Sequence, residues 1–158
     1  MHPTGKRVIA LVVLASQLLW ADGNGNSWNK IRYSGGTVAA KVNPYDWNTT
    51  LTVTPDTIRL VFAGRTTLKL APSQVTALSY GEEAHRRVAD MVALSVVLLN
   101  PLVLFGILHT SRNHFIGIEF HDPDGKPGAV LLEADKNNYR AILKILAAVT
   151  GKTVQNAP

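Results

Sequence analysis

The side chains best suited to metal binding are five histidines, three of which fall close together at His109, His114 and His121. His114 and His121 are an odd number of residues apart, so in a regular strand their side chains point to opposite faces. The spacings typical of zinc sites, HxH and HExxH, are absent from the sequence. We therefore expect these histidines to lie on the surface or at strand ends, with no metal and no cofactor.

A dense charged run, GEEAHRR, supplies Glu82, Glu83, His85, Arg86 and Arg87. Such a run could serve acid–base catalysis or bind an anion, and it is equally typical of a solvated turn or helix start with local ion pairs. The sequence contains no cysteine and no G-x-S-x-G motif, so it offers neither a thiol nor a serine-hydrolase signature. The sequence therefore indicates a protein that is not an enzyme.

The segment Met91–Leu108 contains eighteen residues without a charge, which is formally enough for a membrane helix. Asn100 and Pro101 at its centre favour a break into two helical legs. Three interpretations stay open: a helix or helical hairpin that covers the sheet, a hairpin or interfacial helix that dips into one leaflet, and a single membrane span. A single span would place the two halves of the predicted sheet on opposite sides of the membrane.

We expect this segment to contact lipid or a membrane protein, and the cations on both sides of it to contact anionic head groups. The expected apolar contacts are Met91, Leu94, Val97, Leu98, Leu99, Leu102, Leu104, Phe105 and Leu108. The expected head-group contacts are His85, Arg86, Arg87, Arg112 and His114.

The first residues are typical of an export signal. Lys6 and Arg7 precede an apolar run over residues 8–20, and small residues follow it. An uncleaved anchor or an ordinary first strand or helix also fits this run. We expect residues 1–23 to be a signal peptide and the protein to be exported, either periplasmic or membrane-associated.

The charge balance argues against a nucleic-acid partner. The chain of 158 residues has 16 Lys and Arg against 11 Asp and Glu, and removal of Lys6 and Arg7 would lower its net charge from +5 to +3. Nucleic-acid binders usually show a stronger, clustered excess of basic residues interleaved with aromatics. With 46% hydrophobic and 17% charged residues, the chain is also unlike a disordered one.

Turn residues separate short runs that alternate between apolar and polar side chains, which is typical of antiparallel strands. In the run 57–63, for example, Ile58 and Leu60 point to one face and Arg59 to the other. The loop DPDGKPG, residues 122–128, predicts a turn rather than a calcium loop, because it lacks the further ligands that calcium needs. The expected strands are residues 37–43, 50–54, 57–63, 66–71, 74–80, 114–121 and 129–134.

The C-terminal run DKNNYRAILKILAAVTGK predicts an amphipathic helix, with Asp135 as its N-cap and Gly151 just past its end. Its apolar stripe consists of Tyr139, Ile142, Leu143, Leu146 and Val149. A basic row, Lys136, Arg140 and Lys144, flanks the stripe and is either a solvated face or a contact with lipid or a partner.

Seven short antiparallel strands followed by one amphipathic helix resemble the pleckstrin-homology-like superfold over residues 35–151. The resemblance implies a mainly β domain, with a bent antiparallel sheet or partly open barrel closed at one end by the helix and, here, an apolar helical insert. The segments WNKIRYSGGT, LSYGEEAHRRV and HFIGIEF are similar to uncharacterised exported bacterial proteins.

The expected organisation is a signal peptide (1–23), a linker or N-terminal extension (24–36), one domain (37–151) with the insert 91–108, and a tail (152–158). The expected function is that of a non-enzymatic membrane-associated module that binds lipid or a membrane protein through the insert. The alternative is a protein that binds a small apolar ligand such as a lipid, with the insert as a lid.

Overall fold

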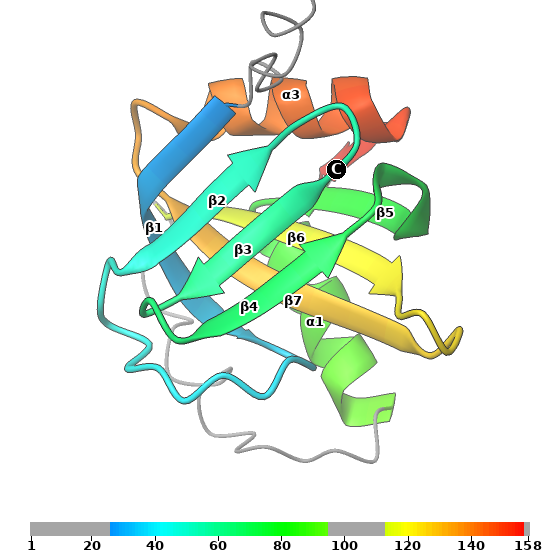
Figure 1. The fold of residues 1–158 in the computed structure, drawn as a ribbon, viewed down its shortest axis with the longest axis horizontal. Coiled ribbons are helices and arrows are strands. Elements are labelled where there is room, and N and C mark those ends of the chain that lie inside the picture. Colours follow the sequence, from blue (N-terminus) through cyan, green and yellow to red (C-terminus); the bar gives the residue numbers. More distant parts are fainter. Residues whose placement is uncertain (1–25, 95–112, 157–158) are drawn as a thin grey trace, which may run out of the picture.

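The computed structural model describes residues 26–94 and 113–156, which form eight strands and two α-helices (Figure 1). The strands are β1 (Asn26–Gly36), β2 (Thr49–Val53), β3 (Ile58–Phe62), β4 (Thr66–Leu70), β5 (Val75–Tyr80), β6 (His114–His121), β7 (Pro127–Ala134) and β8 (Val154–Asn156). The helices are α1 (Glu82–Leu94) and α3 (Tyr139–Thr150), and a short 3-10 turn, η2 (Pro72–Gln74), precedes β5. The predicted signal peptide and residues 95–112 lie outside the described residues.

The strands form one sheet in the order β4-β3-β2-β1-β7-β6-β5-β8. All neighbours are antiparallel except β8, which pairs in parallel with β5, so the sheet is mixed rather than purely antiparallel. In Figure 1 the strands β2, β3 and β4 cross in front of β6 and β7, and α3 lies across one end. The expectation of a mainly β domain with a C-terminal helix is confirmed.

Alternation along the strands places one face of each in the main core, as the sequence predicts. In β3, Ile58 and Leu60 are buried and Arg59 between them is exposed. In β6, Ile116 and Ile118 belong to the main core, which also contains buried residues of β1, β2, β3, β7 and α3. These apolar faces of distant strands therefore meet in one core.

Helix α1 covers the opposite face of β6 and β7, where it forms a second apolar cluster. Its members are Ala84, Val88 and Val92 of α1 with Phe115, Ala129 and Leu131 of the strands. Gly117 permits the close approach, because a Cβ there would lie 2.4 Å from the Ser79 Oγ and 3.3 Å from the Ala84 Cα. Both faces of β6 are thus covered, and its residues 115–120 are buried without interruption.

The C-terminal helix follows the predicted stripe. Ile142 and Leu146 are fully buried, and Gly151 ends the helix at φ 67° with its N–H bound to the Ala147 carbonyl. The predicted N-cap is wrong by three residues: α3 begins after Asn138, and Asp135 instead accepts a hydrogen bond from the backbone N–H of Asn137 in the preceding turn. The local Asx turn competes with capping and delays the helix start.

The predicted N-terminal linker is wrong, because residues 26–36 form β1 in the middle of the sheet, between β2 and β7. The register of β1 shifts between Trp28 and Ile31 and again between Tyr33 and Gly35, and such irregularities hide the period-two pattern. The predicted tail also contains a strand, β8. Three residues carry too little pattern to be recognised from the sequence.

The predicted strand at residues 37–43 is also wrong. Val38, Ala40 and Val42 do alternate inward and pack against the main core. Their backbone, however, forms local bonds, from the Ala40 N–H to the Val38 carbonyl and from the Val42 N–H to the Ala40 carbonyl. The alternation of apolar and polar residues here therefore reflects side-chain burial, and the backbone does not pair with a neighbouring strand along this segment.

Met91–Leu94, the first residues of the predicted insert, are the last turn of α1, which starts at Glu82, and the rest of the predicted insert lies outside the described residues. Within the described residues, no helix is long and apolar enough to span a membrane.

Candidate binding site

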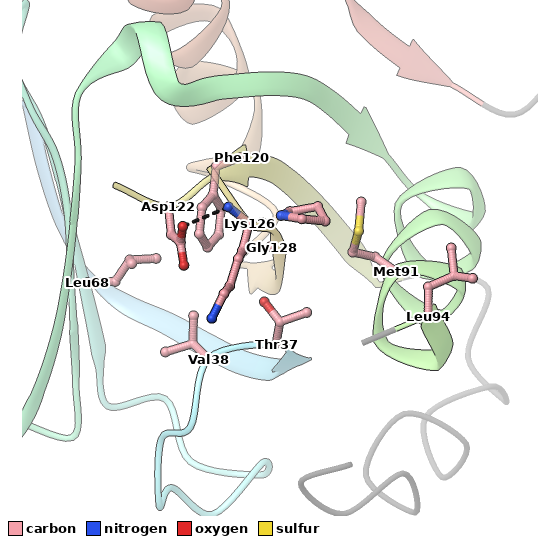
Figure 2. Close-up of a pocket in the computed structure, with 10 residues that line it drawn as sticks. Thr37, Val38, Leu68, Met91, Leu94, Phe120, Asp122, Lys126 and Gly128 are labelled. Atoms are coloured by element: carbon pink, nitrogen blue, oxygen red, sulfur yellow. Dashed lines mark hydrogen bonds between the residues drawn. The ribbon is translucent and has the colours of Figure 1, made fainter. Parts of the chain in front are cut away.

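A cavity of about 600 Å³ opens where the end of α1, the β6–β7 turn and the chain after β1 meet (Figure 2). It is lined by Thr37 and Val38 after β1, Leu68 of β4, Met91 and Leu94 of α1, and Phe120, Asp122, Lys126, Pro127 and Gly128 around the β6–β7 turn. Its volume lies within the range of about 300–1,000 Å³ typical of small-molecule sites, and most of these side chains are apolar. The cavity is therefore suited to an apolar ligand.

The predicted turn at residues 122–128 builds one rim of this cavity. One carboxylate oxygen of Asp122 accepts hydrogen bonds from the backbone N–H groups of Asp124 and Lys126, at 2.9 and 2.8 Å. Gly128 lies directly under the ring of Phe120, because a Cβ there would approach that ring to 2.7 Å. The Phe120 ring therefore packs directly against the backbone of Gly128 and forms one wall of the cavity.

Two of the predicted apolar contacts, Met91 and Leu94, line the cavity (Figure 2). Leu94 is 82% exposed, the highest value among the exposed large apolar residues of the described chain. The remaining predicted contacts lie outside the described residues. They are Val97, Leu98, Leu99, Leu102, Leu104, Phe105 and Leu108.

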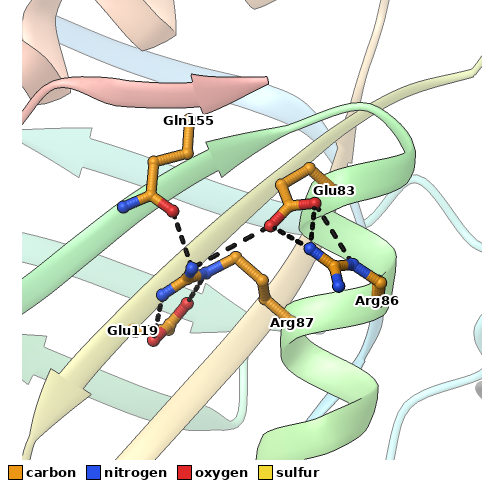
Figure 3. Close-up of polar contacts among 5 residues, drawn as sticks. All are labelled: Glu83, Arg86, Arg87, Glu119 and Gln155. Atoms are coloured by element: carbon orange, nitrogen blue, oxygen red, sulfur yellow. Dashed lines mark hydrogen bonds and ion pairs between the residues drawn. The ribbon is translucent and has the colours of Figure 1, made fainter. Parts of the chain in front are cut away.

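Arg87, one of the predicted head-group contacts, is bound within the protein (Figure 3). Its Nε donates to Glu119 Oε1 at 2.5 Å and its Nη2 to Glu119 Oε2 at 3.1 Å, while Nη1 donates to Gln155 of β8 at 2.6 Å. Glu119 is buried, and the hydrogen bond to this carboxylate is the main cause that raises the pKa of Arg87. This guanidinium therefore connects α1, β6 and β8.

Arg86 is bound to Glu83 in the first turn of α1, through Nη2 at 2.8 and 2.7 Å and Nε at 3.2 Å (Figure 3). The charged run is therefore the start of a helix with local ion pairs. Both arginines have a carboxylate partner, so their charges are already compensated inside the protein. Their contact with head groups stays a prediction.

The predicted histidines lie in two different settings. The His85 ring approaches the Phe115 ring edge-on at 6.1 Å beneath α1. The His114 ring stacks on Tyr139, the first residue of α3, with centroids 3.8 Å apart, and its Nδ1 lies 2.7 Å from the Tyr80 Oη. Burial is the main cause that raises the pKa of Tyr80. The fifth predicted cation, Arg112, lies outside the described residues.

Two contacts of Arg32 were not predicted from the sequence. Arg32 of β1 forms an ion pair with the buried Glu133 of β7, and its guanidinium lies 5.2 Å from the centre of the Trp47 ring. Local patterns cannot reveal this pair, because Arg32 and Glu133 are 101 residues apart in the sequence. No group of three or more metal-ligating side chains occurs among residues 26–94 and 113–156.

Seventeen chains from solved structures match this chain in fold. No protein-family model and no curated protein sequence matches the chain. One chain from a solved structure, described as the Spt16D Pob3N heterodimer, matches 84% of this chain with a TM-score of 0.46 and 10% sequence identity. The match covers 53% of that chain, so this protein spans about half of its length. A similarity of this extent assigns neither a family nor a function.

Proposed function

We propose that the protein is a pleckstrin-homology-like binding module, without a catalytic centre, that takes a small apolar ligand in the cavity between α1 and the β6–β7 turn. The observation that carries this proposal is the cavity itself, with its apolar walls and its volume of about 600 Å³. A bent sheet closed at one end by a C-terminal helix is also the arrangement that the pleckstrin-homology-like resemblance implies. Export and membrane association stay predictions from the N-terminal sequence.

Binding of a fluorescent long-chain fatty acid, such as dansylaminoundecanoic acid, tests the proposal on the full chain. We expect saturable binding with one site per chain. Leu94→Asp places a charge on the wall of the cavity and should weaken binding about tenfold, which is about 1.4 kcal/mol. Because Leu94 is largely exposed, this substitution should leave the fold intact.

Ala93→Asp is the matched control, because it adds the same charge at the neighbouring exposed position without lining the cavity. Its affinity for the probe should stay within about twofold of the unmodified chain. Absence of saturable binding, or equal weakening by both substitutions, would contradict a ligand site in this cavity.

A second candidate function is contact with lipid or a membrane protein through residues 91–108. The observation in its favour is Leu94, a large apolar side chain that is mostly exposed where α1 leads into this segment. Flotation of residues 24–158 with phosphatidylcholine vesicles tests it, with Leu99→Asp and Leu104→Asp combined as the variant. Loss of flotation in the variant supports contact with lipid, whereas a chain that never floats contradicts it.

A further inference from the structure

The net positive charge of residues 22–158 comes from the last 23 residues. Residues 22–135 contain ten Lys and Arg against eleven Asp and Glu, a net charge of −1. Residues 136–158 contain Lys136, Arg140, Lys144 and Lys152 and no acidic residue, a net charge of +4. The basic character of residues 22–158 therefore belongs to α3 and its flanks.

These four cations are exposed, and within residues 26–94 and 113–156 none of them forms an ion pair with a carboxylate. Three other cations of the chain differ from these four. Arg32, Arg86 and Arg87 each have a glutamate partner in the fold. The charge of the C-terminal helix is thus available to an external partner.

Two of the cations, Arg140 and Lys144, lie on the side of α3 that faces away from the core, and Lys136 and Lys152 are exposed just before and just after the helix. Ile142 and Leu146 point inward, and Arg140 and Lys144 follow each other by one helical turn on the exposed side. Ala141 and Ala148 are the other exposed residues of the helix.

The position of Arg140 is unfavourable for the helix itself. It lies in the first turn of α3, which contains no acidic residue, and the N-terminal end of a helix carries a partial positive charge. Its Nε donates to the Tyr139 Oη at 2.8 Å, and its guanidinium lies 5.4 Å from the centre of that ring. Arg140 therefore opposes the helix dipole, and its contacts in the fold are with the Tyr139 side chain rather than with a carboxylate.

We propose that the exposed face of α3 docks on an anionic lipid surface, with Lys136, Arg140, Lys144 and Lys152 as the head-group contacts. Lipid is favoured over nucleic acid because the chain also carries the uncharged runs 8–20 and 91–108, which could enter an apolar phase beside the head groups. The proposal does not depend on the cavity or its ligand.

The test compares the full chain on phosphatidylcholine vesicles with and without phosphatidylglycerol. We expect a partition coefficient that is higher on the anionic vesicles and falls at high salt, because exposed charges are screened. The combined substitution Arg140→Glu and Lys144→Glu should lower the ratio of the partition coefficients on anionic and neutral vesicles by about tenfold or more. An acidic residue in the first turn of α3 favours the helix, so this variant should fold, as circular dichroism can verify.

Arg59→Glu with Lys69→Glu is the matched control. These residues are exposed cross-strand neighbours on β3 and β4, and their reversal changes the net charge by the same amount on another face. The control should keep the preference for anionic vesicles within about twofold. Equal losses in the two variants would mean that only net charge matters and would overturn the proposal.

A titration with duplex DNA tests whether the exposed face of α3 binds a polyanion rather than an anionic lipid surface. If Arg140→Glu with Lys144→Glu lowers the affinity for DNA and leaves the vesicle preference unchanged, the face binds a polyanion and the lipid proposal is wrong.

Discussion

Arg87 of α1 and Glu119 of β6 form a bidentate ion pair. The pair attaches the helix to the face of the sheet opposite the main core. The same guanidinium donates to Gln155, so it also holds β8, the last strand. Because α1 carries Met91 and Leu94 to the cavity, this ion pair positions one wall of the proposed ligand site. The stability of the pair is therefore relevant to binding.

Arg87→Ala should lower the free energy of unfolding by about 2 kcal/mol, because it leaves the buried Glu119 carboxylate without its partner. A fully buried pair would cost about 3–5 kcal/mol to break, but the Arg87 side chain is 31% exposed and partly screened by water. Urea denaturation measures the change. Arg86→Ala is the control: its side chain is 70% exposed, so the loss should stay within about 0.5 kcal/mol.

Gly117→Ala should destabilise the packing of α1 on the sheet. The new methyl group would lie 2.4 Å from the Ser79 Oγ of β5 and 3.3 Å from the Ala84 Cα of α1, so the Ser79 side chain or the helix must shift, at a cost of about 1–3 kcal/mol. The midpoint of urea denaturation measures this cost. Ser79→Ala removes the oxygen and should restore part of the stability in the double variant. Full stability of Gly117→Ala alone would contradict the close approach of α1.

Asp122→Ala should loosen the β6–β7 turn by removing the acceptor of two backbone N–H groups. We expect a loss of about 1 kcal/mol in the free energy of unfolding and weaker binding of the fatty-acid probe, because this turn lines the cavity. Asp124→Ala, at the neighbouring exposed position, should change stability by less than about 0.5 kcal/mol. Equal effects of the two substitutions would show that the turn does not depend on this carboxylate.

The free energy of unfolding should fall at alkaline pH because of the buried hydroxyl of Tyr33. Burial raises the pKa of its hydroxyl well above the ordinary value of 10.0, and the hydroxyl donates to the Val38 carbonyl. Above about pH 10 the unfolded chain therefore loses a proton that the folded chain keeps, so the free energy of unfolding falls by up to about 1.4 kcal/mol per pH unit. Below that pH the contribution is fully present.

Urea denaturation between pH 9 and 11, a range set at about one unit on each side of the ordinary tyrosine pKa, measures this slope. Tyr33→Phe should reduce the slope and also lose about 0.5–1.5 kcal/mol at neutral pH with the hydrogen bond. Tyr45→Phe is the control, because Tyr45 is 68% exposed and its substitution should leave the slope unchanged.

Local patterns were sufficient to predict much of the fold. The alternation in β3 and β6, the apolar stripe of α3 and the turn at residues 122–128 are each encoded within a few residues, and the structure has them where the sequence indicates. The predictions failed for β1 and β8, and for the false strand at 37–43. In each case the decisive interaction is with a strand far along the chain, or is missing despite a suitable pattern.

The candidate site was predicted only in part. Met91 and Leu94 were identified as apolar contacts, but the sequence does not indicate that they share a cavity with Val38, Leu68 and Phe120. Likewise, His114 was identified as a cation beside the insert, and only the fold stacks it on Tyr139. Such groupings join residues that are tens of positions apart, beyond the reach of any local period.

The sequence by itself determined which faces are apolar and where charge accumulates, because residue type and spacing settle both. It therefore contained the inward faces of the strands, the buried side of α3 and the excess of cations after residue 135. The tertiary structure alone decided which cations are compensated. Arg87 meets Glu119 only because α1 packs along β6, whereas no carboxylate within the described residues reaches Arg140 or Lys144. Charge pairing depends on distances of a few ångströms, and these are fixed by the packing of the sheet and its helices.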